Sequence, residues 1–357
     1  MRKHYLDNIR WVTVVLVVFY HVFYMYNGEG VAGGLGKITD LEVQYYDLYL
    51  NFVYPWLMPI LFIVSGITSR LYLEKHSDKE FIRSRTTKLL VPSTIGLFVF
   101  QFIQGYISMA LSNALDQMAG APWFVKYLIM VLSGQGVLWF AQMLWLFSLM
   151  LDGVRKLEKD RGWKLGKKVN LPALLLLTIV VWLSAQIGNT PVIVVYRFGL
   201  YSTLYFLGYF IFSHEEVMET VKKYFWLFLT LAVGLGIGFC FYSFGKNYAD
   251  EPIYRSVMFT SYGWLGCLAI LGGFGRYLDF ETRFTGWMSR HSFGLYVFHY
   301  LGISAVALLV AKPKLLAPLP VYLLSTLAGF AVGYLLPMIV SRLPFIRWAV
   351  LGIKKKG

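Results

Sequence analysis

The sequence predicts an all-α membrane protein with ten transmembrane helices and both termini in the cytoplasm. Three observations predict this fold class. Of 357 residues, 57% are hydrophobic and only 15% are charged, which is too apolar for a soluble domain of this length. Aromatic residues make up 18% of the chain, which suits helices that pack in lipid and anchor at its interfaces. The third observation is a series of ten apolar runs.

Each run approaches the roughly 20 apolar residues that a transmembrane helix needs, and each is bounded by charge or by Gly and Pro. The predicted spans are residues 9–27, 48–70, 91–112, 136–152, 171–187, 196–213, 225–244, 254–275, 291–311 and 319–341. A further apolar stretch, 122–134, is interpreted as an interfacial or re-entrant segment. The chain has no internal repeat or long linker, so residues 1–357 are expected to form a single integral membrane domain.

The distribution of Lys and Arg predicts the orientation, because short cytoplasmic loops retain positive charge. With the N-terminus in the cytoplasm, 26 of the 33 basic residues fall on the inner side. The 19 acidic residues divide into 12 inside and 7 outside, so the inner side carries the whole formal charge of +14. Topology and attraction to anionic membrane lipid account for this charge, and no nucleic-acid partner is expected.

One sizeable segment outside the membrane, residues 71–90, is expected to be structured. Ser77 and Glu80 have the spacing of a capping box, in which each residue satisfies a backbone amide of the other. We therefore expect a short cytoplasmic basic helix near residues 77–90 that leads into the third span.

Two histidines lie inside predicted spans, where ionisable side chains are costly and mark candidate sites. His21 lies in the outer half of the first span and His299 in the inner half of the ninth. Arg10 precedes His21 by eleven residues on the same helix, about 20° from eclipsed and about 16 Å lower along the axis. This layout suits a long ligand with a charged head. Asp7 is expected to orient the Arg10 guanidinium through an i,i+3 ion pair.

A second cluster of basic residues, Arg83, Arg85 and Lys88, stands at the cytoplasmic entrance to the third span. Guanidinium forks and an ammonium point charge both suit a phosphate or pyrophosphate group. The alternative is that these residues only enforce the positive-inside topology.

Other polar residues of the spans are more simply explained by helix packing. Pro55 and Pro59 predict a kinked second span, and Ser65 and Gly66 predict a close helix approach near its end. Ser65 has no adjacent base in the sequence, which disfavours a nucleophilic role. Three glutamines are expected to form hydrogen bonds between helices: Gln101, Gln104 and Gln142.

Together these residues resemble the acyltransferase-3 family of integral membrane O-acyltransferases. Five segments carry the resemblance, in order and over nearly the entire chain: Tyr5-Leu-Asp-Asn-Ile-Arg10 with His21 after ten further residues, Phe62-Ile-Val-Ser-Gly66, Arg85-Thr-Thr-Lys88-Leu-Leu-Val-Pro92, Leu138-Trp-Phe140, and Ser292-Phe-Gly-Leu-Tyr-Val-Phe-His299. Lys88 stands where the family commonly has a second Arg, which affects bidentate phosphate recognition but not anion binding as such.

The resemblance implies a ten-helix enzyme of the inner (plasma) membrane. Such an enzyme moves an acyl group from cytoplasmic acyl-CoA to a hydroxyl of an extracytoplasmic glycan or a similar acceptor. The N-terminal residues are particularly similar to members that succinylate periplasmic glucans, so acetyl and succinyl groups both stay open. Acyl-CoA is then a donor substrate, and no permanently bound cofactor is expected.

On this hypothesis Arg10, Arg85 and Lys88, with Arg83, bind the phosphates of coenzyme A, and His21 acts at the thioester. The imidazole takes the proton of the acceptor hydroxyl as a general base or forms a transient acyl-imidazole. The candidates for oxyanion donors or supporting residues are Tyr20, Ser65, Trp139, Tyr296 and His299. The acceptor is expected to meet an outer segment that includes Glu29, Asp40, Glu42, Tyr45, Tyr46 and Asp47.

Two other classes of protein compete with this interpretation. A transporter or flippase for a glycan or lipid-linked precursor also suits ten spans, but no pair of corresponding broken helices appears in two halves of the sequence. A membrane cytochrome would use His21 and His299 as axial ligands of one haem. Only two cysteines occur, Cys240 and Cys267, both in apolar runs, so no disulfide framework, cysteine-rich zinc site or other metal site is predicted.

Overall fold

The computed structural model describes residues 2–190 and 195–353, and within these ranges the chain is helical and contains no strand. The all-α prediction is therefore confirmed. Eight helical segments of this part of the chain are long and apolar enough to cross a membrane. They are His4–Met25, Tyr45–Leu73, Asp78–Leu111, Gly136–Glu158, Phe225–Ser243, Val257–Tyr277, Arg283–Ala311 and Pro318–Val340.

The two remaining predicted spans form shorter helices. These are α10 (Leu171–Ser184) with 14 residues and α11 (Phe198–Phe210) with 13. At 1.5 Å per residue each is about 20 Å long, less than the roughly 30 Å of a hydrocarbon core. The chain fits a multi-pass membrane protein, whereas the count of ten spans and the cytoplasmic termini stay predictions. The apolar stretch 122–134 contains an 11-residue helix, α7 (Trp123–Ser133).

The chain divides into two compact units, and three of its long helices contribute to both. Unit 1 comprises residues up to Thr13, Leu48–Ile82 and Leu146–Ser289. It contains parts of four helices that it shares with unit 2: α1 (His4–Met25), α3 (Asp78–Arg85), α8 (Trp139–Glu158) and α16 (Arg283–Val306). The helices that belong to it entirely are α2 (Leu48–Leu73), α9 (Arg161–Gly166), α10, α11, α12 (Glu215–Lys223), α13 (Phe225–Ser243), α14 (Glu251–Tyr254) and α15 (Val257–Tyr277).

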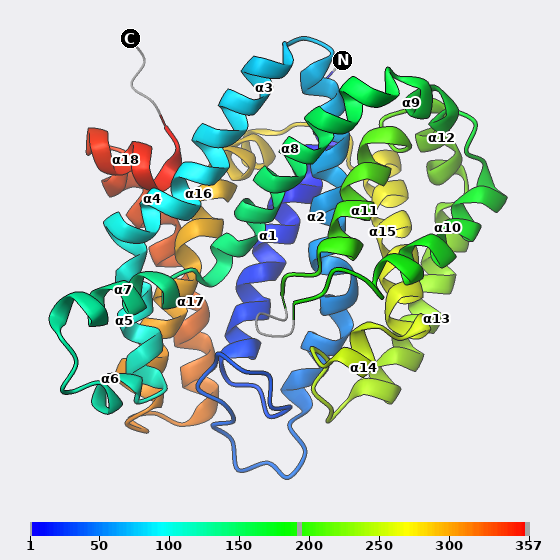
Figure 1. The fold of residues 1–357 in the computed structure, drawn as a ribbon. Coiled ribbons are helices and arrows are strands. Elements are labelled where there is room, and N and C mark those ends of the chain that lie inside the picture. The colour runs from blue at the N-terminus through cyan, green and yellow to red at the C-terminus, as the bar shows by residue number, and fades with distance from the viewer. Residues whose placement is uncertain (1, 191–194, 354–357) are drawn as a thin grey trace. The chain divides into compact units, whose positions relative to one another are not determined.

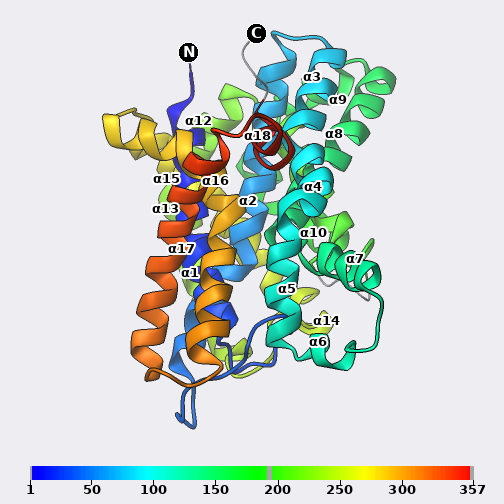
Figure 2. The ribbon, with the colours of Figure 1, turned by 90° about the vertical axis from the view of Figure 1, so that its left-hand side faces the viewer.

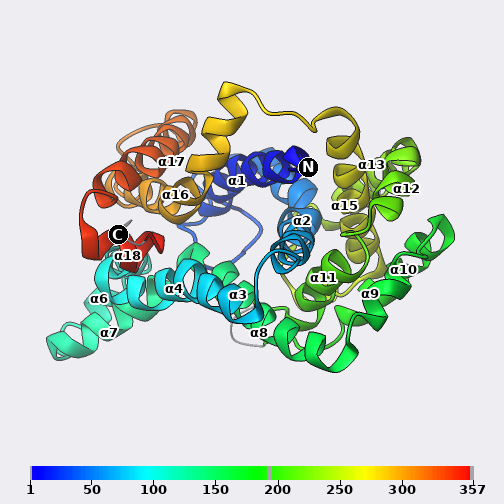
Figure 3. The ribbon, with the colours of Figure 1, turned by 90° about the horizontal axis from the view of Figure 1, so that it is seen from above.

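Small residues bring the helices of unit 1 close together. α2 lies along α11, and α13 lies along α15 (Figure 1 and Figure 3). A methyl group added at Gly66 would overlap the carbonyl oxygen of Tyr205, and one at Gly208 would overlap that of Ile63. The predicted close approach at Gly66 is confirmed, since the backbones of α2 and α11 touch where neither residue has a side chain.

Unit 2 comprises Val14–Asp47, Arg83–Trp145 and the residues from Arg290 onward. Its own elements are η1 (Tyr45–Asp47), η2 (Thr86–Leu90), α4 (Val91–Gly96), η3 (Leu97–Gln101), α5 (Phe102–Leu111), α6 (Ala114–Gln117), α7, η4 (Gly136–Leu138), η5 (Ala307–Ala311), α17 (Pro318–Val340) and α18 (Pro344–Leu351). Three helices meet at Gly329 of α17, where a methyl group would lie 3.1 Å from Ile303 of α16 and 3.2 Å from Val18 of α1. Figure 2 shows α16 and α17 running side by side.

Unit 2 contains three five-residue π-helical turns: η2, η3 and η5. Two of them, η2 and η3, flank α4. η2 ends just before the third predicted span and η3 lies within it, and Asp78–Leu111 nevertheless forms one continuous apolar helical segment. π-turns are uncommon and concentrate at functional sites. The apolar pattern did not predict them, because a local change of hydrogen-bond register leaves hydropathy unchanged.

The segment before the third span has the predicted capping box. Glu80 accepts a hydrogen bond from the Ser77 amide at 2.9 Å, and the Ser77 hydroxyl accepts one from the Glu80 amide at 3.3 Å. α3 then continues directly into η2. The structure thus has a basic helix before the third span, and its cytoplasmic location stays a prediction.

The sequence predicted one sizeable structured segment outside the spans, and three further short helices, α9, α12 and α18, lie outside the predicted spans as well. In α12, Glu215 and Glu216 stand in the first turn and Lys222 and Lys223 in the last, the charge order that a helix dipole favours. The Lys3 ammonium lies 2.6 Å from the Glu215 carboxylate and lowers the pKa of that carboxyl. These short amphipathic helices have too few apolar residues to appear in a search for spans.

We predict that Gly66→Ala destabilises the protein by about 1–3 kcal/mol, because the added methyl group overpacks the contact between α2 and α11. Thermal unfolding in detergent measures the effect. Gly234→Ala on α13 is the matched control, since nothing lies within 4 Å of a methyl group there. Equal melting temperatures for the two variants would contradict the close packing.

The capping box predicts a pH-dependent start of α3. Hydrogen bonds from the Ser77 amide and hydroxyl lower the pKa of the Glu80 carboxyl. The contact therefore stabilises the first turn above the ordinary glutamate pKa of 4.5 and is lost as the pH falls through the lower value of the folded state. We expect amide protection in this turn to be lost when the pH falls below the folded-state pKa of Glu80, and to be low at every pH in Glu80→Ala, which has no acceptor for the Ser77 amide. Protection that is the same for both proteins at pH 7 would contradict it.

Candidate active site

The two histidines of the predicted spans contact each other in unit 2. His21 of α1 and His299 of α16 are 278 residues apart in sequence, yet His21 Nδ1 lies 3.0 Å from His299 Nε2. His21 Nδ1 also lies 2.9 Å from the carbonyl oxygen of Val17. His299 is fully buried, whereas His21 is partly exposed. Direct contact between these two nitrogens leaves no space for the iron that a shared haem would place between them.

Aromatic side chains surround the histidine pair. The Tyr300 ring centroid lies 5.0 Å from that of His21, and the Tyr24 centroid lies 5.9 Å away. The Tyr300 hydroxyl donates to the carbonyl oxygen of Gly33 at 3.2 Å, which ties the loop after α1 to α16. Tyr300 was not predicted as a site residue from the sequence. Its position directly after His299 is the one feature that could have indicated it.

Tyr296 and Trp139 lie near the start of α8. The Tyr296 hydroxyl donates to the carbonyl oxygen of Val137, and the Tyr296 ring meets Phe140 edge-on with centroids 6.1 Å apart. Trp139 is the first residue of α8 and is partly buried. The Leu138-Trp-Phe140 segment and the segment that carries His299 therefore pack against each other within unit 2.

Amide side chains join further helices of unit 2. Ser304 donates to Gln104 Oε1 at 3.0 Å, and Gln142 Nε2 donates to the carbonyl oxygen of Ser93 at 2.8 Å. The predicted interhelical hydrogen bonds of Gln104 and Gln142 are thus confirmed. For Gln101 the prediction is not met in the part of the chain that the structure describes, where its buried Nε2 has no hydrogen-bond partner.

Arg10 belongs to unit 1, where its guanidinium contacts Asp7 and Thr68. Its Nη1 lies 3.2 Å from Asp7 Oδ1, which confirms the predicted i,i+3 ion pair. Its Nη2 donates to the Thr68 hydroxyl at 2.7 Å. Thr68 in turn donates to the carbonyl oxygens of Val64 and Ser65, so Arg10 is joined to the end of α2 that carries buried Ser65. Sequence reasoning missed Thr68 because only the packing of α1 against α2 brings it to Arg10.

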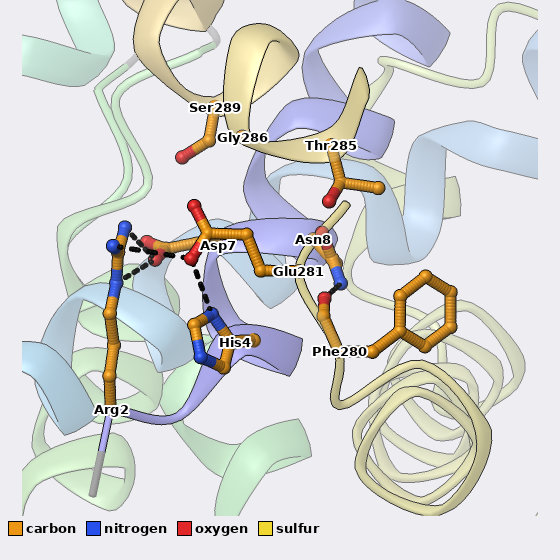
Figure 4. A pocket seen from close by; sticks show the side chains of 9 residues that line it. All are labelled: Arg2, His4, Asp7, Asn8, Phe280, Glu281, Thr285, Gly286 and Ser289. Carbon is orange, nitrogen blue, oxygen red and sulfur yellow. Dashed lines mark hydrogen bonds and ion pairs between the residues drawn. The ribbon is translucent and has the colours of Figure 1, made fainter. Parts of the chain in front are cut away.

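Asp7 also lines a polar pocket of unit 1, together with Arg2, His4, Asn8, Phe280, Glu281, Thr285, Gly286 and Ser289 (Figure 4). Arg2 Nη2 lies 2.8 Å from Asp7 Oδ2, so one carboxylate serves two guanidinium groups, those of Arg2 and Arg10. Figure 4 shows Glu281 reaching Arg2 and His4. Asp7, which is itself held by Arg2, orients the Arg10 guanidinium, and both residues precede Arg10 in the chain.

The three basic residues before the third span lie in unit 2. Arg83 and Lys88 are exposed and Arg85 is partly exposed. Lys88 belongs to the π-turn η2, whose backbone at Thr87 touches Gly352. Gly352 has a φ of +64°, a left-handed conformation that glycine adopts without strain, and it ends α18. The C-terminal helix therefore packs on the turn that presents Lys88.

Comparison with known proteins assigns the family. The profile of the acyltransferase-3 family, described as an acyltransferase domain, matches residues 3–338, nearly the whole chain and both units. No curated protein and no solved structure matches. The match includes the histidine pair, Arg10 and the basic segment before the third span, and it identifies the chain as an acyltransferase of the acyltransferase-3 family.

Proposed function

We propose that the protein is an inner-membrane O-acyltransferase that moves an acetyl or succinyl group from cytoplasmic acyl-CoA to a hydroxyl of an extracytoplasmic glycan or similar acceptor. Membership of the acyltransferase-3 family is the evidence for acyl transfer as the reaction type. The observation that carries the proposal is the imidazole of His21, partly exposed and held by a second histidine on a membrane-spanning helix.

The donor is assigned to the basic residues. Arg10, Arg85 and Lys88, with Arg83, are proposed to bind the phosphates of coenzyme A. Arg10 supports this role because Asp7 and Thr68 fix its guanidinium while its side chain keeps 36% of its surface exposed. The exposure of Arg83 and Lys88 leaves them accessible to a phosphate from the aqueous side.

The path from phosphate to thioester is proposed to follow α1. Arg10 and His21 lie on one unbroken helix, His4–Met25, so their separation of eleven positions corresponds to about 16 Å along its axis. The extended pantetheine arm of the donor would cover this distance and bring the thioester carbonyl to the imidazole. A rigid helix fixes the separation, which a loop would not.

At the thioester, the imidazole of His21 takes the proton of the acceptor hydroxyl as that oxygen attacks the carbonyl carbon. The carbon–sulfur bond of the tetrahedral intermediate then breaks, and the departing thiolate receives the proton. In the alternative route the imidazole first accepts the acyl group and then passes it on. Ser65, Trp139, Tyr296 and His299 are proposed as oxyanion donors or supporting residues.

The acceptor is assigned to the loop between α1 and α2. Asp40, Glu42, Tyr45 and Tyr46 are exposed there and offer carboxylates and ring faces to a carbohydrate. Asp47 and Glu29 are buried, and Asp47 accepts a hydrogen bond from the Gly28 amide at 2.8 Å. We therefore assign the exposed residues to acceptor contact and Asp47 to holding the loop.

We predict that His21→Ala lowers kcat for acyl transfer by about 10²–10⁴-fold, the usual contribution of a general base, while Arg10→Ala mainly raises KM for acyl-CoA. Transfer from radiolabelled acyl-CoA in membrane vesicles measures both constants. His214→Ala is the matched control, because His214 is a buried histidine of unit 1 whose Nε2 meets the carbonyl oxygen of Trp163. Full transfer by well-expressed His21→Ala would rule out the proposed mechanism.

The basic segment generates a second prediction. Lys88→Ala and Arg85→Ala should each raise KM for acyl-CoA about tenfold, which corresponds to about 1.4 kcal/mol of donor binding. Lys88→Arg should keep or improve the affinity, because a guanidinium adds a bidentate phosphate contact. Lys79→Ala removes an exposed charge from the same helical segment and serves as the control. If Lys79→Ala raised KM equally, general charge rather than a phosphate contact would be responsible.

A further inference from the structure

The two nitrogens of the His299 ring have different surroundings. Nδ1 lies 2.9 Å from the carbonyl oxygens of both Leu295 and Tyr296. Carbonyl oxygens only accept hydrogen bonds, so a neutral His299 carries its proton on Nδ1 and its lone pair on Nε2. The lone pair therefore faces His21 Nδ1, which lies 3.0 Å from Nε2.

His21 Nδ1 thus has two acceptors as neighbours, His299 Nε2 and the carbonyl oxygen of Val17 at 2.9 Å. A nitrogen between two acceptors carries a proton. In neutral His21 the remaining nitrogen, Nε2, then holds the lone pair. We propose that His299 is a positioning residue that fixes the tautomer of His21, so that His21 Nε2 is the atom that accepts the proton of the acceptor hydroxyl.

This inference rests on the proposed function and adds to it which nitrogen of His21 accepts the proton. The hydroxyl proton moves to His21 Nε2 as the oxygen–carbon bond forms, and it passes to the thiolate sulfur as the carbon–sulfur bond breaks. The proton on His21 Nδ1 stays in place throughout, shared between His299 Nε2 and Val17. Of the two roles proposed above for His299, oxyanion donor and supporting residue, this leaves the second, because its single N–H is directed at the two carbonyl oxygens of its own helix.

The surroundings of His299 hold this geometry. His299 has no exposed surface, and its neighbour Tyr300 lies against the His21 ring. One turn later, Ser304 donates to Gln104 Oε1 of α5 and to the carbonyl oxygen of Tyr300. The segment of α16 that carries His299 is thereby joined to a neighbouring helix within unit 2, and the two carbonyl oxygens at Nδ1 orient the His299 ring toward His21.

Three substitutions of His299 separate an acceptor role from a packing role. Glutamine carries an amide oxygen near the position of the histidine Nε2 and can accept from His21 Nδ1. Asparagine is one methylene shorter and reaches only the Nδ1 position, and leucine has no acceptor. We expect His299→Leu and His299→Asn to lower kcat by about 10- to 100-fold with KM for acyl-CoA unchanged, and His299→Gln to recover most of the loss.

His21→Ala and the control His214→Gln are measured in the same vesicles, and melting temperatures in detergent report folding. Three results would overturn the role of His299. In the first, His299→Asn is as active as His299→Gln; in the second, His299→Gln is as inactive as His299→Leu; in the third, all three variants keep the wild-type kcat. If His299→Leu does not fold, the comparison of glutamine with asparagine carries the test alone. A wild-type kcat in His21→Ala would instead overturn the proposed function, so the two failures are distinguishable.

Discussion

A polar side chain within the membrane must find its hydrogen-bond partner in the protein, because the hydrocarbon offers none. This constraint accounts for the best-defined contacts of the spans. His21 meets His299, Gln104 meets Ser304, and in unit 1 the Asn51 side chain accepts from Ser243 at 2.5 Å. In each case the partners belong to different helices. The same contacts that satisfy the polar groups therefore fix the relative rotation of the helices within each unit.

Glycine makes such contacts possible, since polar side chains of modest length join two helices only when the backbones approach closely. In unit 1 the paired glycines Gly66 and Gly208 remove the side chains that would separate α2 from α11. In unit 2, Gly329 allows α17 to contact Val18 of α1 and Ile303 of α16, the two helices that carry the histidine pair. The Ser-Gly segment of the second span thus contributes packing, and Thr68 links the carbonyl oxygen of Ser65 to Arg10.

The sequence predicted features that depend on local spacing. Apolar runs located the helices, the Ser77 and Glu80 spacing predicted a cap, and the three-residue separation of Asp7 and Arg10 predicted their ion pair. Features that depend on tertiary structure were not predicted. The histidine pair needs α1 and α16 to be neighbours, and Arg2 reaches Asp7 only through the conformation of the N-terminal segment. Hydropathy likewise contained no signal for the π-turns or for the short length of α10 and α11.

The proposed role of His299 also bears on why a second histidine, rather than a carboxylate, stands beside His21. In soluble proteases and other hydrolases with a Ser-His-Asp triad, a buried aspartate fixes the tautomer of the histidine and stabilises the imidazolium by its charge. A carboxylate at the centre of a membrane-spanning helix costs about 2.5–3.5 kcal/mol or more. A neutral imidazole fixes the tautomer through the same hydrogen bond without that cost. It stabilises the imidazolium less than a carboxylate does, and this weaker hold favours return of the proton to the departing thiolate.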